Sequence, residues 1–117
     1  MLIGAGEAGR TLIQEIQNSR YLDQKICCVI DDNRRKIGRY ILGIRVVGDR
    51  NAIKRSVEHY GIEQIIIAIP SAGSRKIRPI LEICKDTGCE LKILPGVYQL
   101  VNGEVNVSKL RPVNIED

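Results

Sequence analysis

The sequence contains neither tryptophan nor phenylalanine, and its four tyrosines make up only 3% of the 117 residues. Hydrophobic residues nevertheless reach 44%. The core must therefore be built from isoleucine, valine and leucine, a composition typical of parallel strands buried on both faces. Proteins that bind single-stranded nucleic acid interleave aromatic and basic side chains, and this sequence does not. Its net charge of +4 is spread among 14 acidic residues, so we expect a solvated surface and no nucleic-acid partner.

Long apolar runs are also missing. No run approaches the roughly 20 residues that span a bilayer, and the N-terminus has no basic segment followed by an apolar one. His59 is the only histidine, and no C-x-x-C spacing occurs among the four cysteines, Cys27, Cys28, Cys84 and Cys89. Metal sites need clusters of such ligands. We therefore expect a soluble domain without a metal, whose cysteines stay reduced and pack as small hydrophobic side chains.

Short segments rich in isoleucine and valine alternate with segments of helical period, as in repeated β-α units. The pattern predicts one domain over residues 1–117 with a Rossmann-like, doubly wound parallel sheet in a three-layer α/β/α arrangement. Strands are expected at 1–3, 25–30, 64–69 and 90–94, and residues 33–48 are expected to form loop and short strand.

The helices have recognisable ends. Asp49 is expected to cap a helix that buries Tyr60 and stops at Gly61, and Ser74 to cap one that stops at Gly88. In the tail, 97–101 and 104–107 flank Asn102-Gly103, the residues preferred in a two-residue hairpin turn, and 111–117 has linker character. We expect a hairpin and linker over 97–117, in a domain excised from a longer protein.

Gly4-x-Gly6-x-x-Gly9 has the spacing of a dinucleotide-binding loop. In such loops the first glycine permits the tight turn, the second lets a phosphate approach the backbone, and the third lets helix and strand pack closely. The motif follows a predicted strand and opens a predicted helix, whose N-terminus would face the phosphates. Asp31 lies 22 residues beyond Gly9, at the end of the next strand, where its carboxylate could accept hydrogen bonds from a ribose.

Other residues around this loop are further candidates. Asp32 adjoins Asp31 with its side chain expected to point away, and Ser71 follows the most apolar strand, either as a ligand donor or as part of a turn. The full expected cofactor-binding set is Gly4, Gly6, Glu7, Ala8, Gly9, Asp31, Asp32 and Ser71. Because a carboxylate at position 31 favours an unphosphorylated ribose, NAD is the expected cofactor, with NADP and other nucleotides kept open. The alternative is that the glycines only shape a βα turn beside an empty pocket.

No catalytic residues are expected. Neither Ser71 nor Ser74 has a base spaced to activate it. Tyr21 and Lys25 have the Tyr-x-x-x-Lys spacing of short-chain dehydrogenases, but they fall between the first helix and the second strand rather than on one long helix.

Several motifs together resemble a known family: Gly-Ala-Gly-Glu-Ala-Gly-Arg at 4–10, Val-Ile-Asp-Asp-Asn at 29–33, Lys-Ile-Gly at 36–38, Val-Gly-Asp at 47–49, Ile-Ala-Ile-Pro-Ser at 67–71, Ile-Leu-Pro-Gly at 93–96 and Val-Asn-Ile-Glu-Asp at 113–117. Over essentially its whole length the chain is similar to the N-terminal Rossmann-like, CoA-binding-like domain of membrane-anchored polysaccharide-biosynthesis proteins of the nucleoside-diphosphate-sugar 4,6-dehydratase/epimerase family. Similar domains occur in lipid-linked sugar-phosphate transferases, but the closing motif favours the dehydratase type. The short segment before Gly4 departs from the family pattern.

The resemblance implies a parent enzyme acting on sugar nucleotides, such as UDP-N-acetylglucosamine, at the cytoplasmic side of the membrane. In that family transmembrane helices precede this domain, and a larger domain with bound NAD and the catalytic residues follows it. The leading hypothesis is therefore a non-catalytic module that binds NAD or a nucleotide-sugar, docks on the missing catalytic domain and forms a homo-oligomer. The alternatives are an interaction module with an empty pocket and a redox-sensing NAD(H) regulator without its DNA-binding element.

Overall fold

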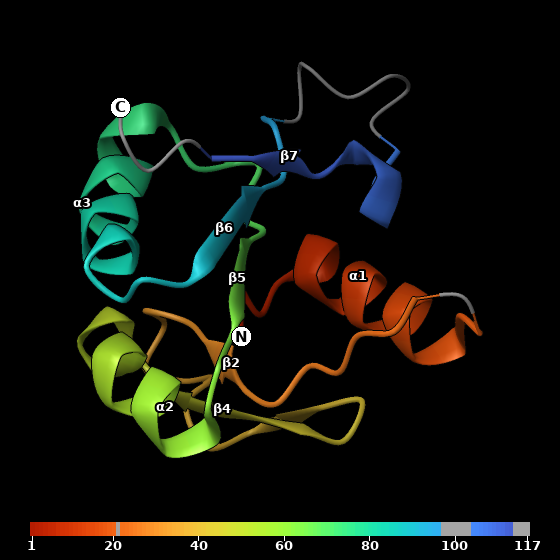
Figure 1. Ribbon diagram of the computed structural model, residues 1–117, viewed down its shortest axis with the longest axis horizontal. Coiled ribbons are helices and arrows are strands. Elements are labelled where there is room, and N and C mark those ends of the chain that lie inside the picture. Colours follow the sequence, from red (N-terminus) through yellow and green to blue (C-terminus); the bar gives the residue numbers. More distant parts are fainter. Residues whose placement is uncertain (21, 97–103, 114–117) are drawn as a thin grey trace.

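A sheet of seven short strands runs through the middle of the computed structural model, which describes residues 1–20, 22–96 and 104–113 (Figure 1). Its order is β3-β4-β2-β1-β5-β6-β7, with the five inner strands parallel and the two edge strands antiparallel to their neighbours. The strands are β1 Leu2–Ile3, β2 Val29–Ile30, β3 Tyr40–Ile41, β4 Ile44–Gly48, β5 Gln64–Ile67, β6 Glu90–Ile93 and β7 Arg111–Pro112.

Helices cover both faces of this sheet. Figure 1 shows α2 (Ile53–Tyr60) and α3 (Ser74–Lys85) on one side, and α1 (Glu7–Asn18) with the 3-10 turn Val107–Lys109 on the other. The three-layer α/β/α prediction is confirmed. None of the helices in the described part of the chain has the length and apolar character to cross a bilayer.

The core is aliphatic and divided in two by the sheet. On the side of α2 and α3 it contains Ile3, Ile30 and Ile67, while neighbouring strand residues such as Leu2 and Val29 pack against α1 on the other side. Alternate residues of a strand point to opposite faces, so the three central strands β2, β1 and β5 contribute to both halves. Both halves must be apolar, which explains the nearly continuous isoleucine and valine of these strands.

Two glycines of the glycine-rich loop are required by packing. Gly4 has φ +117, and a Cβ there would lie 2.4 Å from the carbonyl oxygen of Ala68 at the end of β5. A Cβ at Gly9, in the first turns of α1, would lie 1.9 Å from the carbonyl oxygen of Gly4. The helix, the turn and β5 therefore meet without side chains between them.

The first strand and the strands expected over 64–69 and 90–94 are each one or two residues shorter than predicted. The second strand was expected over 25–30 but comprises only Val29–Ile30, because these residues alone lie opposite Leu2–Ile3 of β1. The region 33–48, expected as loop and short strand, contains two strands that pair as the β3–β4 hairpin. Its two-residue turn uses Leu42 and Gly43, both with positive φ, and leucine in such a turn is uncommon.

Most helix ends agree with the prediction. Asp49 caps as expected, accepting the N–H of Asn51, although the first turn, Arg50–Ala52, is a 3-10 helix (η1). Gly61 ends α2 in the left-handed conformation. The prediction that Tyr60 is buried is wrong, since its side chain lies on the solvent side of the last turn and is 40% exposed.

Helix α3 is displaced slightly from its expected ends. Its N-cap is Gly73 rather than Ser74, which is the first helical residue. The helix ends at Lys85, and Gly88, with φ +76, closes the turn that follows.

In the tail, the described residues 104–113 pack against the rest of the domain. Residues 104–106 are irregular, and the N–H of Val107 donates to the Glu15 carboxylate of α1. Val105, Val107 and Leu110 pack against the core on the α1 side, and Arg111–Pro112 pairs with β6. The first arm of the expected hairpin at 97–101, its turn at 102–103 and the end of the expected linker at 114–117 lie outside the described residues, as does Tyr21.

Replacing Gly9 with alanine tests the packing of the loop. We expect Gly9→Ala to lower the free energy of unfolding by about 1–3 kcal/mol because the methyl group overpacks the contact with Gly4, although alanine favours the helix by about 1 kcal/mol. The measurement is urea denaturation, read as a lower midpoint at unchanged slope. Gly6→Ala, whose Cβ meets nothing within 4 Å, is the control. A Gly9→Ala chain as stable as the control would contradict this packing.

Candidate functional site

The strand order has a topological switch point between β1 and β5. From β1 the chain proceeds outward to β2 and β4, and later returns to β5 and proceeds outward to β6 on the other side. The loops after β1 and β5 therefore separate at the carboxyl edge and leave a crevice between them, which is where open α/β sheets bind ligands. The predicted site residues all follow β1, β2 or β5.

Gly6 differs from the other two glycines of the loop. It is exposed, it is the N-cap of α1 with φ −85, and a Cβ there would meet no atom within 4 Å. Packing does not require glycine at this position. No side-chain hydrogen bond caps the helix, so its first N–H groups are available to an acceptor outside the helix. Glu7 beside it is exposed, whereas Ala8 is half-buried and packs against the core on the α1 side.

Asp31, directly after β2, is hydrogen-bonded to the glycine-rich loop. One carboxylate oxygen accepts the N–H of Ala5 at 2.8 Å and the other accepts the N–H of Asn33 at 2.8 Å. Each oxygen retains a further lone pair. The carboxylate thus holds the loop and can still accept hydrogen bonds from a sugar hydroxyl.

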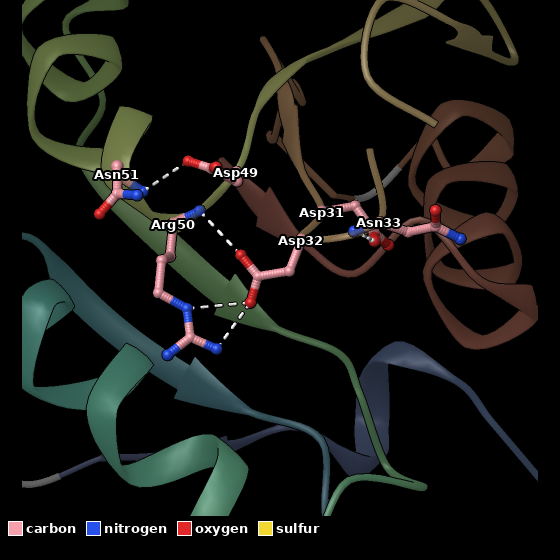
Figure 2. A network of polar contacts seen from close by, with 6 residues as sticks. All are labelled: Asp31, Asp32, Asn33, Asp49, Arg50 and Asn51. Carbon is pink, nitrogen blue, oxygen red and sulfur yellow. Dashed lines mark hydrogen bonds and ion pairs between the residues drawn. The ribbon is translucent and has the colours of Figure 1, made fainter. Parts of the chain in front are cut away.

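Asp32 does not point away from the site, contrary to the prediction. Figure 2 shows its carboxylate facing Arg50, the first residue of η1. One oxygen accepts the backbone N–H of Arg50 at 3.0 Å, and the other accepts Nε at 2.9 Å and Nη2 at 2.7 Å. The side-chain hydrogen bonds from Arg50 lower the pKa of Asp32 and raise the pKa of Arg50. The ion pair connects the end of β2 to η1, which follows β4.

These loops surround a cavity of about 180 Å³. Its apolar floor is formed by Ile3, Ile30 and Ile80, which belong to the core on the side of α2 and α3. Gly4, Asp31, Asp32, Arg50, Ile69, Ala72 and Lys76 complete its lining. Two larger hollows, of about 650 and 820 Å³, lie along residues 22–27 and include none of the predicted site residues. Their volumes are larger, but Gly4 of the glycine-rich loop and both acids line only the smaller cavity.

Ser71 is placed beside this cavity rather than in it. Its neighbours Ile69 and Ala72 line the cavity, while Ser71 is exposed in the turn after β5. The structure thus brings together Gly4, Asp31 and Asp32 with the open backbone at Gly6, and leaves Ser71 at the margin.

Three basic residues at the site were missed from the sequence. Lys36 donates from Nζ to the carbonyl oxygen of Ala5 at 3.3 Å, which places a positive charge beside the open helix N-terminus. Arg50 and Lys76 line the cavity. Lys36 lies in the motif at 36–38, and Arg50 directly follows the motif at 47–49. Their positions relative to these family motifs were the only features of the sequence that could have indicated a role at the site.

The described side chains offer no metal site, and the buried Cys84 is not an activated thiol. No group of three or more His, Cys, Asp or Glu residues in the described ranges is placed to hold a metal ion. The four cysteines are free, and burial raises the pKa of Cys84 to about 12. A thiol with such a pKa stays protonated near neutral pH and is a poor nucleophile. Cys28, Cys84 and Cys89 are buried, as expected, and Cys27 is half-buried.

Residues 1–95 match the CoA-binding domain family. The chain belongs to this family. It is 31% identical over 118 residues to the capsular polysaccharide biosynthesis protein CapD of Staphylococcus aureus, and 30% identical over 117 residues to the probable polysaccharide biosynthesis protein EpsC of Bacillus subtilis (strain 168). Each alignment covers 100% of this chain and 20% of the relative, so the chain spans about a fifth of the length of these proteins.

Solved structures share the fold. UDP-D-quinovosamine 4-dehydrogenase from Vibrio fischeri superposes with a TM-score of 0.86 at 26% identity, over 98% of this chain and 92% of that one. The Rex-family repressor RSP in complex with NADH gives a TM-score of 0.68 at 18% identity, over 90% of this chain and 50% of that one. A perosamine N-acetyltransferase from Caulobacter crescentus, in complex with CoA and GDP-perosamine, gives 0.60 at 22%, over 77% and 39%. The Rossmann-like fold and the resemblance to polysaccharide-biosynthesis proteins are confirmed.

The ion pair between Asp32 and Arg50 predicts a pH-dependent stability difference between the wild type and Asp32→Asn. Because the folded-state pKa of Asp32 is lowered, its stabilising contribution is present above the ordinary carboxyl pKa of about 4 and is lost as the pH falls through the folded-state value. Both side chains are about a third or more exposed, so we expect less than about 1 kcal/mol. Thermal unfolding from pH 7 downward should show the two chains converging only below pH 4. A constant difference over the whole range would show that the charge of Asp32 contributes nothing.

Proposed function

We propose that this domain binds NAD(H) or a nucleotide-sugar at the carboxyl edge of its sheet, as the non-catalytic nucleotide-binding part of a larger protein. The observation that carries the proposal is the contrast among the three loop glycines. Gly4 and Gly9 are required by packing, whereas Gly6 has open space around it and leaves the start of α1 uncovered. A glycine that the fold does not need, at a helix N-terminus, is explained by close approach of a phosphate.

The surrounding charges support this placement. The N-terminus of α1 and the Lys36 ammonium both favour an anion beside Gly6. Asp31 lies between this position and the cavity, since it hydrogen-bonds Ala5 and also lines the cavity. A nucleotide with its phosphates at Gly6 would present a ribose to the Asp31 carboxylate. A 2′-phosphate on that ribose would meet a negative charge, which is why we place NAD before NADP.

The relatives supply the context for the whole protein. CapD and EpsC are named as polysaccharide biosynthesis proteins, and the Vibrio fischeri protein as a UDP-sugar dehydrogenase. We place this domain in a nucleoside-diphosphate-sugar 4,6-dehydratase or epimerase at the cytoplasmic side of the membrane, following the resemblance of its motifs. The chemistry would reside elsewhere in that protein. Within this chain the single histidine, His59, is exposed at the end of α2 and lines a hollow away from the glycine-rich loop.

The alternative of an interaction module with an empty pocket rests on an expected hairpin in the tail and on the lack of a catalytic set. The first arm and the turn of that hairpin lie outside the described residues, and residues 104–113 pack against α1 and β6. The open space around Gly6 favours nucleotide binding, so we propose one function rather than two.

A ligand screen with a variant that adds a negative charge at the proposed phosphate position tests the proposal. Gly6→Asp introduces a favourable N-cap and should leave stability unchanged or raise it by a few tenths of a kcal/mol, about the N-cap preference of aspartate over glycine. The same carboxylate occupies the phosphate position and repels the ligand. We expect NAD⁺, NADH or UDP-N-acetylglucosamine to raise the thermal midpoint of the wild type by several degrees, and the midpoint of Gly6→Asp not at all.

The control variant is Asn18→Asp, which adds the same charge at the exposed opposite end of α1. It should keep the ligand-induced shift. NADP⁺, coenzyme A and UDP complete the panel and identify the ligand class. If no compound shifts the wild type at millimolar concentration, or if Gly6→Asp shifts as the wild type does, the proposed function is wrong.

A further inference from the structure

Arg50 is the one residue of the cavity lining that combines a fixed side chain with unused donors. Its Nε and one Nη2 hydrogen are engaged by Asp32, and its backbone N–H also donates to that carboxylate. A guanidinium has five N–H donors in one plane, so three remain. Its side chain is 33% exposed, at the mouth of the cavity. Figure 2 shows the guanidinium group extended from η1 and held against Asp32.

We propose that Arg50 is a specificity-determining residue, and that its guanidinium, held in place by Asp32, covers the base of a nucleoside diphosphate whose base enters the 180 Å³ cavity. The inference rests on the proposed nucleotide-binding function and deepens it. ADP units of NAD or coenzyme A and UDP units of nucleotide-sugars share this chemistry.

The position of the cavity relative to α1 supports placing the base in the cavity. α1 and its open N-terminus lie on one face of the sheet, while the floor of the cavity belongs to the core on the other face. Gly4 and Asp31 lie at the edge between them and line the cavity. A ligand with phosphates at Gly6 therefore crosses the edge at Asp31, and the group beyond the ribose enters the cavity. In a nucleotide that group is the base.

The size and lining of the cavity suit a flat base beneath the Arg50 guanidinium. Its volume of about 180 Å³ is below the roughly 300 Å³ typical of pockets for whole ligands, so it admits only part of one. The floor of Ile3, Ile30 and Ile80 is apolar. A flat heterocycle suits such a floor, and a planar guanidinium above it adds stacking and cation–π attraction.

The charge of Asp32 argues against a phosphate at this position. Its carboxylate already neutralises Arg50, with 2.7 Å between Nη2 and Oδ2. A phosphate brought to the same guanidinium would be repelled by that carboxylate. An uncharged base meets no such repulsion, and Asp32 then acts as a positioning residue for the guanidinium plane.

Calorimetric titration of the chain with ADP, UDP and inorganic pyrophosphate tests this role. We expect Arg50→Ala to weaken binding of the preferred nucleoside diphosphate about tenfold, which is the range of a partly desolvated cation–π contact, and to leave pyrophosphate affinity unchanged. Arg50→Lys should lose about as much as alanine, because an ammonium keeps the charge but not the plane. The ADP and UDP arms distinguish a dinucleotide or coenzyme A from a nucleotide-sugar.

Two further variants complete the experiment. Arg45→Ala removes the same charge from an exposed residue of β4 that lies outside the cavity lining, and it should bind as the wild type does. Asp32→Asn should weaken nucleotide binding in the wild type but add no further loss in Arg50→Ala, which identifies it as acting through Arg50.

The possible failures are distinguishable. If the wild type binds neither ADP nor UDP, the proposed function itself fails. If the wild type binds but Arg50→Ala binds equally well, Arg50 makes no contact and this inference is wrong. Arg50→Lys with wild-type affinity, or an equal loss for pyrophosphate and the nucleotide in Arg50→Ala, would assign Arg50 to a phosphate and overturn its role over the base.

Discussion

The contact between the backbone of Gly9 and the carbonyl group of Gly4 determines how the rest of the site is built. At this contact the first helix leaves no room for a side chain, and Gly4 in turn lies against Ala68 at the end of β5. The consecutive elements β1 and α1 are thereby fixed against β5, which lies much further along the sequence, at the carboxyl edge of the sheet. Because α1 starts at that point, its first N–H groups, which no side chain caps, lie beside the glycine-rich loop at the exposed Gly6.

The adjacent residues Asp31 and Asp32 connect β2 to two different loops. Asp31 connects β2 to the glycine-rich loop through Ala5, and Asp32 connects β2 to the crossover after β4 through Arg50. Each carboxylate satisfies backbone N–H groups of a loop that has no regular partner. The same two connections leave a carboxylate at the ribose position and a guanidinium at the mouth of the cavity, so structural support and ligand recognition use the same residues.

The sequence predicted what depends on local pattern. The alternation of apolar strands and amphipathic helices predicted the layers, and the spacing of Gly4, Gly6 and Gly9 with Asp31 predicted the loop and its acid. It did not predict contacts that depend on the path of the chain. Lys36 reaches Ala5 across 31 residues and Arg50 reaches Asp32 across 18, and neither distance is encoded in a local pattern. The β3–β4 turn was missed because leucine at position 42 adopts a conformation that usually marks glycine or asparagine.

The site also extends the sheet where its strands are shortest. β1 and β2 have two residues each, yet hydrogen bonding continues beyond them: Gly4 N–H donates to Ile30 at 2.8 Å and Asp31 N–H donates to Gly48 at 3.0 Å. Gly4 and Asp31, which lie where a nucleotide would bind, therefore also extend the hydrogen bonding of β1 and β2 beyond the ends of these strands. A ligand that bridges Gly6, Asp31 and the cavity would hold together the carboxyl ends of β1 and β2 along with the helices on both faces. Binding at this edge would thus stabilise two strands of only two residues each in the middle of the sheet, which couples occupancy of the site to the stability of the fold.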